Sequence, residues 1–250
     1  MKFSDYYKNE GVVESYEEKR SKGIKSGIVR VLERAAIEHL LKNAGKNILE
    51  AGVGTGYITE ILRKHGKVSG FDISPAMISK TKSKFPDMEI KKQDILNLKL
   101  SKKYDAIVSV RVISHFKFDD AKKALENLKK VAKPNASIIF NLENLSPLRR
   151  FLRKILRWGS TETHQYSSSE INRLLKESGL KIKEEFYIDH FFILPLHVLN
   201  KILLNSLRRL IIKLELKLSK VKFASNNTFI KCQKQDKIVF EHAQESKRRT

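Results

Sequence analysis

The stretch Leu49-Glu50-Ala51-Gly52-Val53-Gly54-Thr55-Gly56 decides the fold of this chain. It follows a short apolar run that is typical of a buried strand, and a segment with helical apolar spacing, residues 57–64, comes after it. Glycines at such a turn let the backbone approach a ligand closely, and the start of a helix offers unpaired amide groups. Asp72 ends the next apolar run, where an acid can accept hydrogen bonds from ribose hydroxyls. The pattern predicts a nucleotide-binding strand–turn–helix unit.

The rest of the first two-thirds of the chain alternates in the same way between apolar segments and segments of helical spacing. Strand-like segments occupy residues 47–51, 68–72, 88–91, 104–110 and 137–142, and later 181–188 and 227–233. Helix-like segments occupy residues 28–41, 57–64, 119–132 and 166–179, and Ser74-Pro75 opens another. This alternation predicts a parallel sheet with helices on both faces.

Composition narrows the class of protein. The chain has 250 residues, 41% of them hydrophobic, which suits a globular domain with an ample core. Its single cysteine, Cys232, excludes an intramolecular disulfide framework. The formal net charge of +22 suggests a polyanionic partner, either nucleic acid or an anionic membrane, although a merely soluble basic surface explains it equally well. No apolar run approaches the length of a membrane span and no signal peptide is evident, so we expect a cytoplasmic protein.

The spacing of the glycines distinguishes two families of nucleotide-binding folds. Nicotinamide enzymes normally show G-x-G-x-x-G, whereas here Gly52, Gly54 and Gly56 alternate after Glu50. This arrangement resembles the first motif of class I S-adenosylmethionine-dependent methyltransferases, [DE]-x-G-x-G-x-G. The later motifs of that family resemble residues 66–74, 93–95 and 104–109 of this chain. The resemblance covers roughly residues 6–142 and 166–232.

The resemblance implies a fold and a division of the chain. The expected fold is a seven-stranded, Rossmann-like, doubly wound α/β sheet, mostly parallel with an antiparallel last strand, and with helical insertions after strands five and six. A single methyltransferase domain would span residues 1–240, ahead of a frayed tail at 241–250. Within it we expect a helical lid (1–45), a cofactor-binding half (46–145) and a basic helical cap (146–165 and 191–223).

The resemblance also implies roles for individual residues toward S-adenosylmethionine. Glu50 would hold the loop or approach the methionine ammonium, Asp72 would take the ribose diol, and Asp94 would bind the adenine amino group. Solvated acids at strand ends are the alternative for all three. The full set of expected cofactor-binding residues is Glu50, Gly52, Gly54, Gly56, Asp72, Ile73, Asp94, Ile95, Ser109, Tyr16 and Arg20. The last two belong to the lid, although a helix packed outside the sheet suits them almost as well.

A general base is needed only when the methyl acceptor is a neutral hydroxyl or a similar group. His115, just after the fourth strand, is the first candidate, and His164 and His190 fall in segments that should border the acceptor. Each of the three also suits an architectural role. No cluster of side chains has metal-ligand spacing, so we expect no metal.

The sequence around the fourth strand bears on nucleic-acid substrates. Residues 109–112 read Ser-Val-Arg-Val, where many amino-methylating nucleic-acid enzymes carry a Pro-Pro-aromatic signature. A cysteine nucleophile is also missing there, since Cys232 lies in the last strand. Both differences make RNA the less favoured substrate.

The cap combines basic and apolar residues. In residues 146–158 five basic side chains share one helical face, opposite large apolar ones. Residues 191–221 carry leucines at steps of three and four, together with basic residues opposed only by Glu215. This pattern favours a surface that docks on an anionic membrane, peripheral to its inner face, and admits a small-molecule or lipid-like acceptor. The alternatives are faces that pack on each other or on a second subunit, an RNA methyltransferase, and a catalytically silent S-adenosylmethionine-binding or membrane-associated protein. The sequence does not indicate the oligomeric state.

Overall fold

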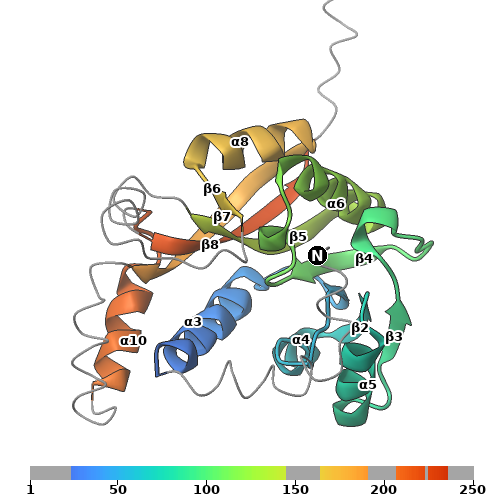
Figure 1. Ribbon diagram of the computed structural model, residues 1–250, viewed down its shortest axis with the longest axis horizontal. Coiled ribbons are helices and arrows are strands. Elements are labelled where there is room, and N and C mark those ends of the chain that lie inside the picture. Colours follow the sequence, from blue (N-terminus) through green and yellow to red (C-terminus); the bar gives the residue numbers. More distant parts are fainter. Residues whose placement is uncertain (1–23, 145–163, 191–206, 223–224, 236–250) are drawn as a thin grey trace, which may run out of the picture.

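A computed structural model describes residues 24–144, 164–190, 207–222 and 225–235 of the chain (Figure 1). Its strands are β1 (Asn47–Ala51), β2 (Lys67–Asp72), β3 (Glu89–Lys92), β4 (Tyr104–Ser109), β5 (Ala132–Asn144), β6 (Gln165–Tyr166), β7 (Leu180–His190) and β8 (Ser225–Lys234). Its α-helices are α3 (Ile24–Leu40), α4 (Thr59–His65), α5 (Pro75–Lys84), α6 (Phe118–Val131), α8 (Ser168–Glu177) and α10 (Arg208–Lys217), and two 3₁₀ turns are η1 (Ile95–Asn97) and η2 (Ile113–His115). Tyr16, Arg20, the frayed tail and nearly all of the first cap piece lie outside the described residues.

The strands form one sheet in the order β3-β2-β1-β4-β5-β8-β7, and the two-residue strand β6 pairs with β5. Neighbours from β3 to β5 run parallel, whereas β8 runs antiparallel to both β5 and β7. The expected Rossmann-like sheet with an antiparallel last strand is thereby confirmed. In the pairing of β7 with β8, His190 stands opposite Ser225, so the connection between these strands begins and ends at one edge of the sheet.

Helices cover both faces of the sheet, and each face has its own core (Figure 1). Successive residues of β4 divide between the two, because side chains alternate along a strand: Ala106 and Val108 belong to the core under α3, α4 and α10, and Ile107 to the core under α6 and α8. All three side chains are fully buried. This burial on both faces agrees with the predicted sheet that carries helices on both sides.

Local signals explain where elements begin. The hydroxyl of Ser74 accepts a hydrogen bond from the Met77 amide, and Pro75 follows at the first position of α5, as the sequence predicted. The start of β5 differs from the prediction, which placed a helix at residues 119–132 and the strand at 137–142. The strand instead begins at Ala132 and passes through an irregularity in which Asn135 adopts a φ of 62°. An asparagine tolerates that conformation, so the Pro-Asn pair bends the strand without ending it.

Candidate functional site: the loop after β1

The loop that joins β1 to α4 contains three glycines, and they differ in the space around their Cα atoms. Gly52, Gly54 and Gly56 all have positive φ (84°, 53° and 82°), a conformation that favours glycine. A Cβ at Gly52 would stand 2.4 Å from Cγ2 of Val112, and one at Gly56 would meet Phe85 at 3.0 Å. At Gly54 no atom of the described residues lies within 4 Å of that position. Gly54 is therefore the point where a ligand can approach the backbone, while its two neighbours allow close packing of the loop.

Asp72, at the end of β2, lies directly beside Gly54. Its Oδ2 accepts a hydrogen bond from the Gly54 amide, and its Oδ1 accepts one from the Ser74 amide, each at 2.9 Å. Burial raises the pKa of Asp72 above its ordinary value, against the opposing effect of these hydrogen bonds. The carboxylate thus ties the loop after β1 to the loop after β2. Since each carboxylate oxygen has a second lone pair, Asp72 keeps acceptor capacity for a hydroxyl of a ligand.

Glu50 faces the inside of the protein. It is 3% exposed, and its Oε2 accepts a hydrogen bond of 2.5 Å from the hydroxyl of Thr59, the first residue of α4. Burial raises the pKa of Glu50 to about 8; the bond from Thr59 opposes this rise and the charge of Asp72 adds to it. Of the two roles expected for Glu50, this geometry supports holding the loop against α4.

The segment after β3 carries the next two expected residues. Asp94 caps η1, since its Oδ1 accepts a hydrogen bond of 2.9 Å from the Leu96 amide. Ile95 is 6% exposed and packs in the core under α6 and α8. Asn127 of α6 donates hydrogen bonds of 3.0 Å to the carbonyls of both Ile95 and Leu96. Sequence reasoning missed Asn127, because an asparagine within a helix gives no signal of its contact with a distant loop.

The end of β4 forms hydrogen bonds with neighbouring strands and with α3. The hydroxyl of Ser109, fully buried, donates a hydrogen bond of 3.1 Å to the carbonyl of Ala51. Arg111 has a φ of 58°, and its amide donates to Oδ1 of Asn141 at 2.6 Å. The Arg111 guanidinium binds the buried carboxylate of Glu33 in α3, with Nε at 2.6 Å and Nη2 at 2.5 Å from Oε1. Ser109 and Arg111 therefore fix the strand end against β1 and α3, and the arginine was not among the residues expected from the sequence.

Two of the three candidate histidines come together beside this strand end. The backbone amide of His164 donates to the carbonyl of Ser114 at 2.8 Å, which places it next to His115 in η2. The His164 ring lies edge-on to that of Tyr166, with 4.5 Å between their centroids. His190 lies apart from them, 1% exposed, at the end of β7. Its Nδ1 contacts Oε2 of Glu215 and its Nε2 contacts the carbonyl of Val221, each at 2.8 Å.

Two kinds of feature are not found within the described part of the chain. No group of three or more His, Cys, Asp or Glu side chains could hold a metal ion there. Nor is any helix of that part long and apolar enough to cross a membrane.

A family model described as a methyltransferase domain matches residues 16–185. The chain belongs to this methyltransferase family. The recognition of a class I, S-adenosylmethionine-dependent methyltransferase from the motifs is thereby confirmed, together with the cofactor that it implied. The residues fit that group: the backbone of Gly54, which no other described residue covers, lies against the half-buried carboxylate of Asp72, and a nucleoside with a ribose diol suits this arrangement.

Relatives of the methyltransferase include proteins of known name. A chloroplastic magnesium protoporphyrin IX methyltransferase of Arabidopsis thaliana is 28% identical over 155 residues, which are 56% of this chain and 48% of that protein. A ubiquinone biosynthesis O-methyltransferase of Coxiella burnetii is 29% identical over 165 residues, 58% of this chain and 68% of that protein. The chain spans about half the length of several curated relatives it matches.

Solved structures share the fold of the methyltransferase. The crystal structure of a magnesium protoporphyrin IX methyltransferase from Synechocystis with bound SAH has a TM-score of 0.64 to it at 16% identity. The match covers 92% of this chain and 97% of that one. At this identity the likeness establishes the fold alone.

Proposed function

We propose that this methyltransferase moves a methyl group from S-adenosylmethionine to a small-molecule or lipid-like acceptor that it meets at an anionic membrane surface. The proposed contact with a membrane rests on the side chains exposed on the outer face of α10 and on the turn after it. Three large hydrophobic side chains are exposed among the described residues, namely Leu210 (47%), Leu216 (37%) and Val221 (39%). All three belong to this one segment.

The charges on the same segment are of one sign. Its exposed charged side chains are Arg208, Arg209, Lys213, Lys217, Lys220 and Lys222. Glu215, the one acid that the sequence shows among these basic residues, is fully buried against β7, so the described outer face carries no acid. Basic residues interspersed with exposed apolar ones are the pattern of a helix that lies in a bilayer interface. Anionic headgroups attract such a face with on the order of 1 kcal/mol for each basic residue.

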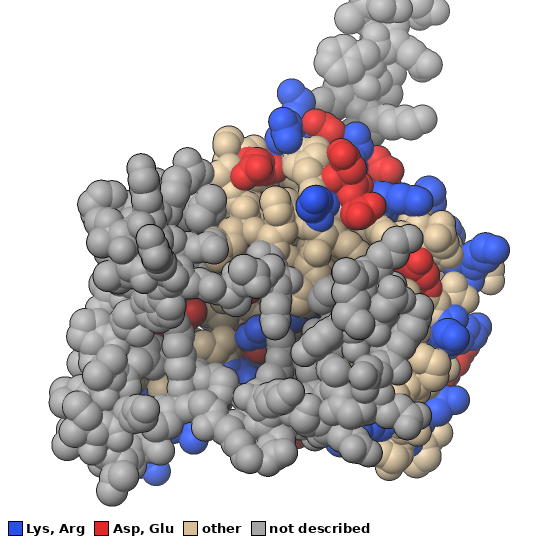
Figure 2. Space-filling model, viewed as in Figure 1, with Lys and Arg blue, Asp and Glu red and all other residues tan. Residues whose placement is uncertain are grey.

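Basic charge alone does not mark α10. Figure 2 shows Lys and Arg side chains along the side of the molecule where β3 and α5 lie, and Asp and Glu side chains around α6 and α8. What distinguishes the α10 segment is the combination of basic and apolar exposure. This combination favours a lipid surface over RNA, which requires aromatic or arginine platforms for its bases.

The acceptor is expected at the carboxyl edge of the sheet, where parallel sheets bind their ligands. Two relatives are named for small molecules, magnesium protoporphyrin IX and the ubiquinone pathway, which supports an acceptor of that size. When bound, S-adenosylmethionine supplies an activated methyl group, so the chain chiefly has to orient the acceptor and exclude water. If the acceptor is a hydroxyl, His115 and His164 are the residues we propose to take its proton, since η2 and the start of β6 bring them to the ends of β4 and β5.

Vesicle flotation tests the docking. We expect the protein to float with vesicles of phosphatidylcholine mixed with phosphatidylglycerol and to stay behind with pure phosphatidylcholine. Replacing both Lys213 and Lys217 by glutamine should weaken binding by about 30-fold, at about 1 kcal/mol for each lysine. The matched control replaces Lys123 and Lys176, exposed lysines of α6 and α8 on the other layer, and should leave binding unchanged. If both double substitutions weakened vesicle binding equally, the effect would come from net charge alone, and this would contradict a docking face at α10.

Release of S-adenosylhomocysteine tests the acceptor class. We expect release with a cell lipid extract and none with total RNA. Release with RNA, together with indifference to vesicles, would establish the RNA alternative. No release with either extract, from a protein that binds S-adenosylmethionine in calorimetry, would establish a silent binding protein.

A further inference from the structure

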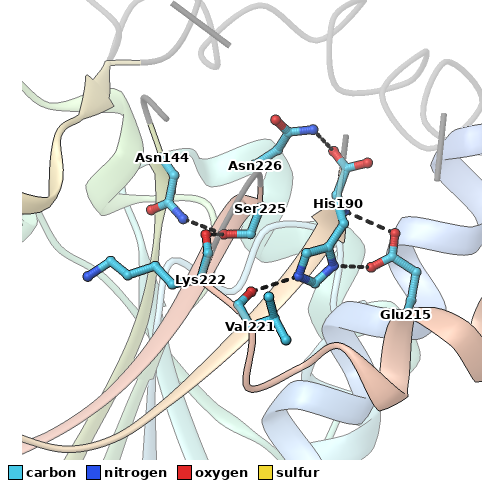
Figure 3. A network of polar contacts seen from close by, with 8 residues as sticks. Asn144, His190, Glu215, Val221, Lys222, Ser225 and Asn226 are labelled. Carbon is cyan, nitrogen blue, oxygen red and sulfur yellow. Dashed lines mark hydrogen bonds and ion pairs between the residues drawn. The ribbon is translucent and has the colours of Figure 1, made fainter. Parts of the chain in front are cut away.

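A buried pair of ionisable side chains joins α10 to the edge strand β7. His190 and Glu215 both have fully buried side chains, and Nδ1 of the imidazole lies 2.8 Å from Oε2 of the carboxylate. The other carboxylate oxygen, Oε1, accepts a hydrogen bond of 3.0 Å from the backbone amide of His190. Nε2 of the ring lies 2.8 Å from the carbonyl oxygen of Val221, just after α10 (Figure 3). His190 thus holds the α10 segment at both of its ring nitrogens.

The partners of the ring determine how many protons it carries. A carbonyl oxygen only accepts, so Nε2 must carry a hydrogen to bond to Val221. A carboxylate also only accepts, so a second hydrogen must lie between Nδ1 and Glu215. If the ring were neutral and Glu215 ionised, one ring nitrogen would carry a lone pair instead of a hydrogen. That lone pair would face an oxygen 2.8 Å away, either Oε2 of Glu215 or the carbonyl oxygen of Val221. The arrangement is therefore stable only with the extra proton in place.

The charged groups around the ring reinforce this state. Glu215 of α10 and Asp189, the preceding residue of β7, both act on the imidazole with negative charge. Figure 3 shows the amine of Lys222 pointing away from the ring. Helix α3 packs against both β7 and α10. Of its charged side chains, His39 contacts Glu184, Glu33 binds Arg111 and Arg34 binds Glu60. Arg30 lies over the ring of Tyr57, and Glu38 is exposed. Lys220 also binds Glu184.

We propose that His190, held doubly protonated by Glu215 and the Val221 carbonyl, is the positioning residue that fixes α10 at the acceptor edge of the sheet. Ile211 is the other buried side chain of the helix, and the carbonyl of Ser219 accepts a hydrogen bond of 2.8 Å from the Tyr187 amide. Apart from these contacts, α10 presents exposed or half-exposed side chains. The protonated pair accordingly supplies the directional part of its attachment. That this attachment presents the docking face to a membrane rests on the proposed function, whereas the protonation itself does not.

The pair makes the attachment of α10 depend on pH. Burial by itself would lower the pKa of His190, but the bonds to Glu215 and Val221 and the two nearby acids outweigh burial and raise it above its ordinary value. A base with a raised pKa contributes its full stabilisation below about pH 6.5, the ordinary value, and loses it as the pH rises through the higher folded value. The helix should therefore be attached at neutral pH and loosen in alkaline solution.

Nuclear magnetic resonance of the full-length chain, labelled with ¹⁵N in histidine, tests the proton directly. At pH 7 we expect the ¹⁵N shifts of His190 to show hydrogens on both ring nitrogens, and to lose one at a pH above that of free histidine. A neutral tautomer of His190 at pH 7 overturns the proposal. This measurement needs no variant, so it stands even if substitutions prevent folding.

Hydrogen exchange of the α10 amides tests the positioning. His190→Gln and Glu215→Ala should each speed the exchange of α10 by about tenfold to hundredfold, the range for one lost hydrogen bond to a charged group, and leave β1 and β4 unchanged. His39→Gln is the control, since His39 also pairs with a glutamate of β7 but is one-third exposed. Unchanged exchange of α10 in both variants overturns the proposal. Because neither measurement uses lipid or acceptor, a failure of the proposed function leaves them intact.

Discussion

Replacing Glu50 by glutamine should stabilise the protein, and the gain should grow with pH. The carboxyl is buried and bound by Thr59, and its pKa is about 8 against an ordinary value of 4.5. Between these two values the unfolded chain is ionised while the folded one keeps its proton, so raising the pH favours unfolding. At about 1.4 kcal/mol for each pH unit, this amounts to about 3 kcal/mol at pH 7 and at most about 5 kcal/mol above pH 8. Glutamine has the shape of the protonated acid and avoids the loss.

Urea unfolding at several pH values between 5 and 9 measures the effect. The free energy of unfolding of E50Q should equal that of the wild type near pH 5 and exceed it progressively above. Glu38→Gln, which removes a carboxyl group from the exposed side of α3, controls for the change in net charge. A difference between E50Q and the wild type that stays constant across the pH range would refute the reasoning, because it would show that Glu50 does not titrate differently in the folded state. Calorimetry of S-adenosylmethionine binding adds a second readout: near-normal affinity of E50Q supports a loop-holding role, and a large loss supports contact with the methionine ammonium.

Three further outcomes follow from the site. Gly54→Ala should lower the affinity for S-adenosylmethionine by at least about tenfold in calorimetry, since a Cβ enters the approach to the backbone, while the positive φ lowers the free energy of unfolding by only about 1 kcal/mol; unchanged affinity would place the cofactor elsewhere. Asp72→Asn places a side-chain NH₂ group opposite one of the two backbone amides that Asp72 now accepts from. It should reduce the affinity for S-adenosylmethionine by about 10- to 100-fold, whereas a merely solvated acid would leave the affinity unchanged. Arg111→Ala leaves the Glu33 carboxylate buried without its partner and should lower the free energy of unfolding by about 3–5 kcal/mol in urea, with partial recovery when Glu33→Gln is added; a loss under 1 kcal/mol would count against the pair.

The cofactor half of the fold was readable from sequence because its signals are local. Apolar runs predicted the position of β1 and the ends of β2 and β4 within a residue, and Ser74-Pro75 predicted the start of α5. The contact between Gly54 and Asp72 also follows once two adjacent parallel strands are recognised, since both loops emerge at one edge.

Contacts between distant segments were not readable in this way. The spacing of leucines in the second cap piece predicted a long apolar stripe, and the sequence showed Glu215 as the one acid among its basic residues. The structure exposes Leu210 and buries Glu215, because the partner of this acid is His190, 25 residues earlier. The pairing of Arg111 with Glu33 joins residues 78 positions apart. No helical or strand period encodes such partners.

The register of β7 against β8 bears on how this enzyme could acquire a different acceptor. Because His190 stands opposite Ser225, the connection between β7 and β8 begins and ends at neighbouring points of the sheet. The entropy of closing such a loop grows only slowly with its length, by about 0.6 kcal/mol for each doubling. Exchanging or lengthening this connection should consequently leave the β1 and β2 loops, and with them the proposed contacts to the nucleoside, unchanged. With the acceptor at this edge of the sheet, as proposed, new specificity would arise by exchanging one connection, without redesign of the β1 and β2 loops.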